Sequence, residues 1–195
     1  HGPRSEADQR HAWHAEAVQL LSRPGLERML HGVVGRPRPA VPVVDEAWVA
    51  RTAQQLAESG ADIATVAHPI DNPADFFAPN VVKVVCKANG DAMYFSRAPL
   101  PFARDHFAQD KDRASLPSGF VACRHIGLYA YRAGFLRAYA KLTPSPVEGF
   151  EALEQLRALW HGYRISVLVS DHLPMPGVDT PEDAARMQEW FSKKT

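Results

Sequence analysis

From Asp45 onward, short β-rich runs alternate with segments of helical periodicity, and this alternation constrains the fold more than any other feature of the chain. Residues 45–59 and 133–142 have apolar side chains at helical spacing. Strands that alternate with helices are typical of α/β architecture, so we expect a mixed sheet with helices packed on it. The predicted strands are residues 61–68, 81–87, 92–97, 121–131 and 164–170.

Capping and turn residues mark several boundaries of these elements. Asp45 can cap the N-terminus of a helix that stops before Gly60. Ser145–Glu148 combines a capping-box serine and glutamate with proline at the first helical position, and Thr180–Asp183 repeats the arrangement. Ala88–Asp91 contains a glycine turn between two β-rich runs, which predicts a hairpin.

The first forty residues differ in composition from the rest of the chain. Residues 11–21 and 26–30 have moderate helical character, and residues 32–44 contain three prolines and two arginines. Such a stretch is typical of a linker or extended segment rather than of a strand interior. We therefore expect residues 1–40 to be a separate segment, disordered or partly helical, and residues 41–195 to form the α/β part.

Charge and cysteine content exclude some classes of function. Lys plus Arg and Asp plus Glu both number 22, so no net field attracts nucleic acid or a membrane surface. No run of 18 apolar residues predicts a membrane span. Cys86 and Cys123 are isolated, without a C-x-x-C metal pattern, which favours a reducing compartment such as the cytoplasm.

Two charged residues stand at positions where α/β proteins bind ligands. Asp179 follows a strand and a loop and precedes a capped helix, so it is a candidate ligand for Mg²⁺. A helix-flanking aspartate that interacts only with the helix dipole has the same pattern. Arg97 ends a predicted strand and can hold a carboxylate through two hydrogen bonds, although the same pattern is more typical of a solvated arginine at a strand end.

Two further pairs of polar residues are candidates for ligand binding. His125 and Tyr129 share one side of a predicted strand with Gly127 between them. The small glycine leaves room for a ligand, but a histidine and a tyrosine that are hydrogen-bonded in the core have the same pattern. Glu154 and Gln155 are predicted to lie within a helix, where they could hydrogen-bond a polyol. The alternative is a solvated face on which Glu154 pairs with Arg157.

Several blocks of sequence, taken in their order and spacing, are more specific than any single residue. The blocks are Ala61–Ile70, Asn80–Val85, Tyr94–Pro101, Arg124–Arg132, Pro144–Pro146, Leu153–Arg157 and Gly177–Asp183. Together they resemble the 3-deoxy-manno-octulosonate cytidylyltransferase (CMP-Kdo synthetase) family from about Val41 to Met187.

The resemblance implies a fold and an activity. The fold would be a nucleotide-diphospho-sugar transferase-like (Rossmann-like) mixed sheet, incomplete at its N-terminal side. The activity would be the transfer of CMP from CTP to the acidic sugar Kdo, with release of pyrophosphate, for lipopolysaccharide biosynthesis. The family's enzymes use Mg²⁺, and they are usually cytoplasmic homodimers.

The resemblance also implies roles for single residues. Arg97 would meet the sugar carboxylate, and Asp179 would bind the catalytic Mg²⁺. The rest of the sugar site would be lined by His125, Tyr129, Glu154 and Gln155.

The first forty-two residues depart from the family pattern. They lack the basic glycine-containing loop for the CTP phosphates, and Arg38–Pro42 stands in place of a block that carries the second metal-binding aspartate. This departure leaves open a non-catalytic chain that binds an acid sugar or only dimerises. CMP-sialic acid synthetase is a further alternative, although the Arg124–Tyr129 and Leu153–Arg157 blocks favour Kdo.

Overall fold

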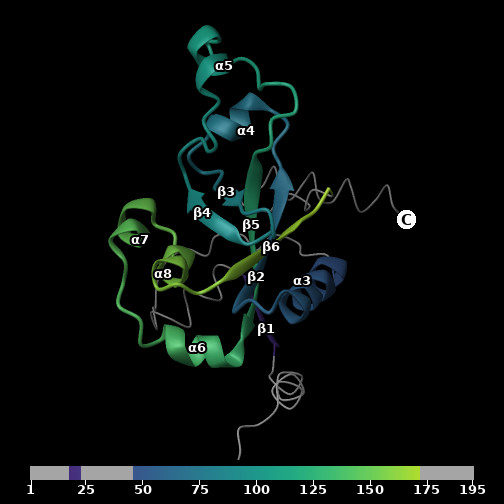
Figure 1. Cartoon of the computed structure of the whole chain (residues 1–195), viewed down its shortest axis with the longest axis vertical. Coiled ribbons are helices and arrows are strands. Elements are labelled where there is room, and N and C mark those ends of the chain that lie inside the picture. The colour runs from purple at the N-terminus through teal and green to yellow at the C-terminus, as the bar shows by residue number, and fades with distance from the viewer. Residues whose placement is uncertain (1–17, 23–45, 172–195) are drawn as a thin grey trace, which may run out of the picture.

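The computed structural model describes residues 18–22 and 46–171, and the structural statements below concern these residues. Within them, six strands form one mixed sheet in the order β4-β3-β5-β2-β6, and β1 pairs with β5 outside this path (Figure 1). The strands are β1 (Val18–Ser22), β2 (Ile63–Pro69), β3 (Lys83–Cys86), β4 (Ala92–Ser96), β5 (Cys123–Arg132) and β6 (Ile165–Val169).

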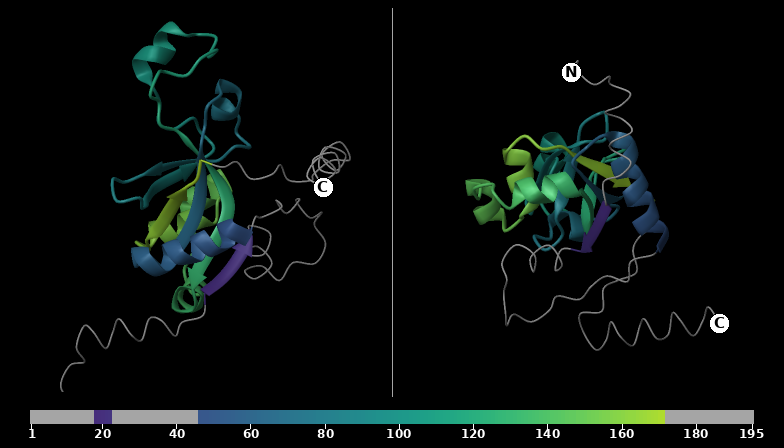
Figure 2. Two further views of the ribbon diagram at one scale, coloured as in Figure 1. Left: turned by 90° about the vertical axis from the view of Figure 1, so that its right-hand side faces the viewer. Right: turned by 90° about the horizontal axis from the view of Figure 1, so that it is seen from below.

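The β2–β6 pair is parallel and the other pairs are antiparallel, which confirms the expected mixed sheet. Helix α3 lies on one side of the sheet and α6, α7 and α8 lie on the other (Figure 2). The helices are α3 (Glu46–Ser59), α4 (Pro73–Phe77), α5 (Arg104–Gln109), α6 (Ala133–Tyr139), α7 (Pro146–Glu151) and α8 (Gln155–Trp160).

Helix α3 covers its side of the sheet with one buried stripe. Trp48, Thr52 and Leu56 are spaced four residues apart, so they share one face of the helix, and each is at most 4% exposed. Trp48 packs with residues of β2 and β5, as does Leu56. The helix ends at Ser59, and Gly60 has a φ of +64°, a conformation that suits glycine. The predicted helix and its glycine stop are confirmed.

The other side of the sheet carries the main core, in which aromatic rings of β5 and α6 form a column. The rings of Tyr129 and Tyr131 are stacked with centroids 5.5 Å apart, and Tyr131 stacks on Phe135 at 6.0 Å. Leu153 and Leu156 close this core from the α7–α8 side, each 1% exposed. Burial of such rings and leucines is the main favourable term that attaches these short helices to the sheet.

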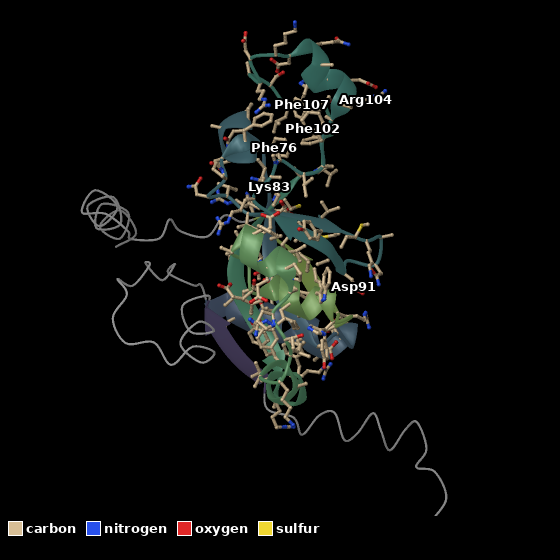
Figure 3. All side chains as sticks on the ribbon, turned by 90° about the vertical axis from the view of Figure 1, so that its left-hand side faces the viewer. Phe76, Lys83, Asp91, Phe102, Arg104 and Phe107 are labelled. Carbon is tan, nitrogen blue, oxygen red and sulfur yellow. The ribbon has the colours of Figure 1, made fainter. Side chains whose placement is uncertain are left out.

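A smaller aromatic core holds α4 and α5 beyond one end of the sheet (Figures 1 and 3). Phe76 is fully buried there, and its ring lies 5.9 Å from Phe107 and 5.1 Å from Phe120. Residues 104–109 form α5 although the segment is polar and has no helical periodicity. Phe107 is 7% exposed in that core, and its burial stabilises a turn of helix that the surrounding polar residues do not predict.

Strand β1 also differs from expectation, because moderate helical character was predicted for residues 11–21. Residues 18–22 are instead a strand that pairs antiparallel with β5, with Leu20 opposite Ala130. Backbone hydrogen bonds to a distant strand outweigh a weak local helix preference. The expected boundary between a first segment (1–40) and an α/β part (41–195) lies outside the described residues and stays a prediction.

The predicted hairpin and capping box are both present. Strands β3 and β4 pair antiparallel around the Ala88–Asp91 turn. At α7, the Ser145 hydroxyl accepts a hydrogen bond from Glu148 N, and Ser145 N donates to Glu148 Oε2, both at 3.2 Å. The second predicted capping box, Thr180–Asp183, lies outside the described residues.

Candidate acid-sugar site

Five of the six predicted site residues come from β4, β5 and α8, which are neighbours in the fold. Arg97 directly follows β4, while His125 and Tyr129 lie on β5. Glu154 and Gln155 stand at the start of α8, which packs against β4. Figure 1 shows α8 beside β4 on the face of the sheet opposite α3. The sixth residue, Asp179, lies outside the described residues.

His125 and Tyr129 form an aromatic pair, as the strand alternation predicts. Their ring centroids are 5.1 Å apart, and the His125 ring also meets Phe95 of β4 edge-on at 5.0 Å. Between them the strand bulges, because Gly127 has a φ of +80° and the register against β2 shifts at this point. The two rings stay on one side of the sheet since their partners on β2 are Ala67 and Thr65, two residues apart.

Thr65, which the sequence analysis did not single out, orients His125. Its fully buried hydroxyl donates to the Leu128 carbonyl at 2.7 Å and lies 2.8 Å from His125 Nε2. A hydroxyl has one proton to donate, so Thr65 accepts from His125, and Nε2 carries the proton. The Gly127 bulge and Thr65 therefore fix both the position of the imidazole and its tautomer.

The guanidinium group of Arg97 is held by backbone carbonyls rather than free in solvent. Nε donates to Glu151 O at 2.6 Å, and the two terminal nitrogens donate to Pro79 O at 3.1 Å and Ala152 O at 3.4 Å. Carbonyl oxygens orient a cation without cancelling its charge. Arg97 is thus a fixed positive group where β4 meets the α7–α8 turn.

Glu151 and Lys83 complete this cluster, and neither was predicted. The Glu151 carboxylate accepts from Ser96 Oγ at 2.6 Å and from Arg97 N at 2.9 Å. Lys83 is 0% exposed, and its ammonium group donates to Ala78 O, Val81 O and Arg97 O at 2.6–2.9 Å. A lysine in the apolar run 81–85 was the one available sequence signal, because a buried lysine needs polar partners.

The cluster retains a local positive charge. Burial lowers the pKa of Lys83, the nearby Glu151 carboxylate partly opposes this effect, and Arg97 adds to it. With Lys83 and Arg97 positive and Glu151 negative, these three groups sum to one positive charge. This net positive charge therefore attracts an anionic group that binds beside Arg97.

The environment of Glu154 and Gln155 differs from the predicted helix interior. Helix α7 ends at Glu151, its C-cap Ala152 has a φ of +50°, and Glu154 is the N-cap of α8. Arg157, the partner of Glu154 in the alternative interpretation, donates to both carboxylate oxygens of Glu148. The left-handed turn at Ala152 starts a new helix direction, which the apolar spacing alone does not reveal.

Gln155 is a buried polar side chain at the start of α8. It is 5% exposed. Glu154 is tied to the core through its carbonyl, which accepts from Tyr139 Oη at 2.9 Å. Because buried amides are normally hydrogen-bonded, the side chain of Gln155 is a candidate to bind a polar ligand.

Residues 18–22 and 46–171 show neither a metal cluster nor a membrane-spanning helix. No three His, Cys, Asp or Glu side chains gather there as a metal site. No helix there has the length and apolar character needed to span a membrane.

A family model for cytidylyltransferases matches residues 13–165, most of the chain. The chain belongs to the cytidylyltransferase family. The match begins at residue 13, ahead of the Val41 from which the sequence blocks were traced.

Individual cytidylyltransferases give the same result. The chain is 51% identical over 175 residues to a 3-deoxy-manno-octulosonate cytidylyltransferase of Methylibium petroleiphilum, covering 89% of this chain and 64% of that protein. It is 51% identical over 152 residues to the enzyme of that name from Herminiimonas arsenicoxydans, covering 78% and 60%. The resemblance is confirmed, and the chain spans about 60% of the length of these relatives.

A solved structure of a CMP:2-keto-3-deoxy-manno-octonic acid synthetase complexed with CTP superposes with a TM-score of 0.68 at 30% identity. The superposition covers 80% of this chain and 60% of that one. The expected nucleotide-diphospho-sugar transferase-like fold class is therefore confirmed.

Proposed function

We propose that this chain supplies the acid-sugar site of a cytidylyltransferase that joins CMP from CTP to Kdo and releases pyrophosphate. The observation that carries the proposal is the Arg97 guanidinium, which three backbone carbonyls hold within a cluster of one net positive charge. An acidic sugar presents matching groups, a carboxylate for Arg97 and hydroxyls for the Gln155 amide. The similarity to enzymes named for this reaction supports the same substrate pair.

The residues divide the work of binding. Arg97 would neutralise and orient the sugar carboxylate, which lowers repulsion between the anionic sugar and CTP. The rings of His125 and Tyr129, together with Glu154 and Gln155, would bind the sugar hydroxyls. The anomeric oxygen would then form a bond to the α-phosphorus as the bond to pyrophosphate breaks. Most of the rate enhancement would come from this alignment.

For the metal, we propose Mg²⁺ with Asp179 among its ligands, by similarity to the family. Mg²⁺ supplies neutralisation of the triphosphate charge in such reactions.

For assembly and location, we propose a homodimer in the cytoplasm whose product is used for lipopolysaccharide biosynthesis. The cytoplasmic assignment is supported by CTP as the nucleotide and by the unpaired thiols of Cys86 and Cys123. We propose neither nucleic acid nor membrane insertion as part of its function.

A chain that binds the acid sugar without turnover is the second candidate. It is favoured by the lack of a matching phosphate loop in residues 1–42. A preference for sialic acid instead of Kdo is the further alternative.

Pyrophosphate release with CTP and either Kdo or N-acetylneuraminic acid distinguishes these candidates. The proposal expects release with Kdo only, and the reverse preference would contradict it. Calorimetric binding of Kdo without pyrophosphate release would support the second candidate.

Gln155→Leu provides the matching test of the site. It should weaken Kdo binding about tenfold, because a buried hydrogen bond to a ligand hydroxyl is lost. Gln54→Leu, on the exposed side of α3, is the control and should leave binding unchanged.

A further inference from the structure

Lys83 is an unusual residue for the middle of a buried strand. It is 0% exposed, and its strand neighbours Val82 and Val84 are 6% and 3% exposed. Lysine is almost never fully buried unless its charge is paired. Here all three ammonium protons are used, each on a different backbone carbonyl. An apolar side chain could fill the same space, so the specific contribution of the ammonium group is its three hydrogen bonds.

The carbonyls that Lys83 binds belong to the surroundings of Arg97. One is the carbonyl of Arg97 itself, and the others, Ala78 O and Val81 O, flank the segment that contains Pro79. The Arg97 guanidinium donates to Pro79 O in that same segment. Lys83 therefore holds the backbone of Arg97. It also holds the 78–81 loop, which a terminal guanidinium nitrogen of Arg97 contacts. Figure 3 shows Lys83 where the α4–α5 part joins the sheet.

We propose that Lys83 is a positioning residue for the acid-sugar site, which it serves by holding Arg97 and the 78–81 loop so that the guanidinium meets the sugar carboxylate. This inference rests on the proposed function. Lys83 makes no contact with the sugar in this scheme. Its second contribution is electrostatic, because it adds positive charge beside Arg97 that Glu151 only partly offsets.

A purely structural role makes a different prediction. If Lys83 only attached the 78–81 loop to the sheet, its loss would lower stability and weaken all ligands equally. If Lys83 positions Arg97, it affects recognition of the sugar carboxylate. Loss of Lys83 would then specifically reduce the preference for Kdo over an analogue without the carboxylate charge, such as the C1 methyl ester of Kdo.

The experiment compares Lys83→Met with Lys141→Met, a control at an exposed lysine. Affinities for Kdo and for its C1 methyl ester are measured by calorimetry on the 195-residue chain. We expect Lys83→Met to reduce the Kdo-to-ester affinity ratio about tenfold, and Lys141→Met to leave it unchanged. An unchanged ratio in folded Lys83→Met would overturn the inference. Absence of Kdo binding by the unsubstituted chain would overturn the proposed function as well.

A measurement on the unsubstituted chain covers the case in which Lys83→Met does not fold. The Lys83 ammonium should give a slowly exchanging ¹⁵N signal, because its protons are buried and hydrogen-bonded. If Lys83 positions Arg97, that signal shifts when Kdo is added and does not shift with the methyl ester. No shift with Kdo, under conditions in which calorimetry detects binding, contradicts the inference.

Discussion

Glu151 Oε1 accepts a hydrogen bond from Ser96 Oγ at 2.6 Å, and this bond joins the end of β4 to the end of α7. The other carboxylate oxygen accepts from Arg97 N, so one side chain satisfies two donors at the start of the Arg97 loop. The two residues are 55 positions apart in the sequence. The candidate site is thus assembled by a single carboxylate that ties the sheet to the helical side.

Glu151→Gln should destabilise the chain by about 1–3 kcal/mol. Ser96 Oγ and Arg97 N each donate to a different oxygen of Glu151, and an amide has only one acceptor oxygen. The substitution also removes the charge that raises the pKa of Lys83, so that pKa should fall further. Urea unfolding measures the stability change. Glu58→Gln on the exposed side of α3 is the control and should stay within about 0.5 kcal/mol of the parent.

Thr65→Val should leave the His125 Nε2–H without its acceptor and the Leu128 carbonyl without its donor. We expect a loss of about 1–3 kcal/mol in the free energy of unfolding, and a change of tautomer visible in the imidazole ¹⁵N spectrum. Thr52→Val is the matched control, because that equally buried hydroxyl bonds only to Trp48 O within its own helix. Identical imidazole spectra for the parent and Thr65→Val would contradict the role of Thr65.

Cys86 should make stability fall as the solution becomes alkaline. Burial raises the pKa of its thiol from 9.0 to about 11, and Cys123 nearby adds to the shift. Between these pH values the unfolded chain loses the thiol proton and the folded chain keeps it. The contribution of Cys86 is therefore complete below pH 9 and is lost as the pH rises toward 11, by at most about 1.4 kcal/mol per pH unit.

Urea unfolding at intervals between pH 8 and 11 would measure this slope. Cys86→Ala removes the titrating group, so its stability should fall less steeply with pH than that of the parent. Equal slopes for the two proteins would show that the thiol does not contribute.

Ser145→Ala should lower stability by about 1 kcal/mol, because it removes the acceptor for Glu148 N at the start of α7. Ser145→Asp keeps an acceptor at this N-cap and should recover most of the loss. Thermal unfolding of the three proteins provides the measurement. A Ser145→Asp variant as unstable as Ser145→Ala would indicate that packing of the 3% exposed Ser145, rather than capping, is responsible.

Much of the fold could be predicted because its signals are local. The Ser145–Glu148 box, the Gly60 stop and the Ala88–Asp91 turn each act within a few residues of chain, so the pattern and the structure agree. The local signal failed for residues 18–22 and for Arg104–Gln109. There a distant strand and a buried phenylalanine decide the conformation.

The sequence by itself determined the family, the mixed α/β class and the candidate residues Arg97, His125, Tyr129 and Gln155. Only the tertiary structure decided what holds them, namely Glu151 on the Arg97 loop and Thr65 on His125. The physical reason is that a hydrogen bond between residues more than fifty positions apart leaves no periodic pattern in either segment. The Ser96–Glu151 bond exists only because the sheet and α7 are packed together.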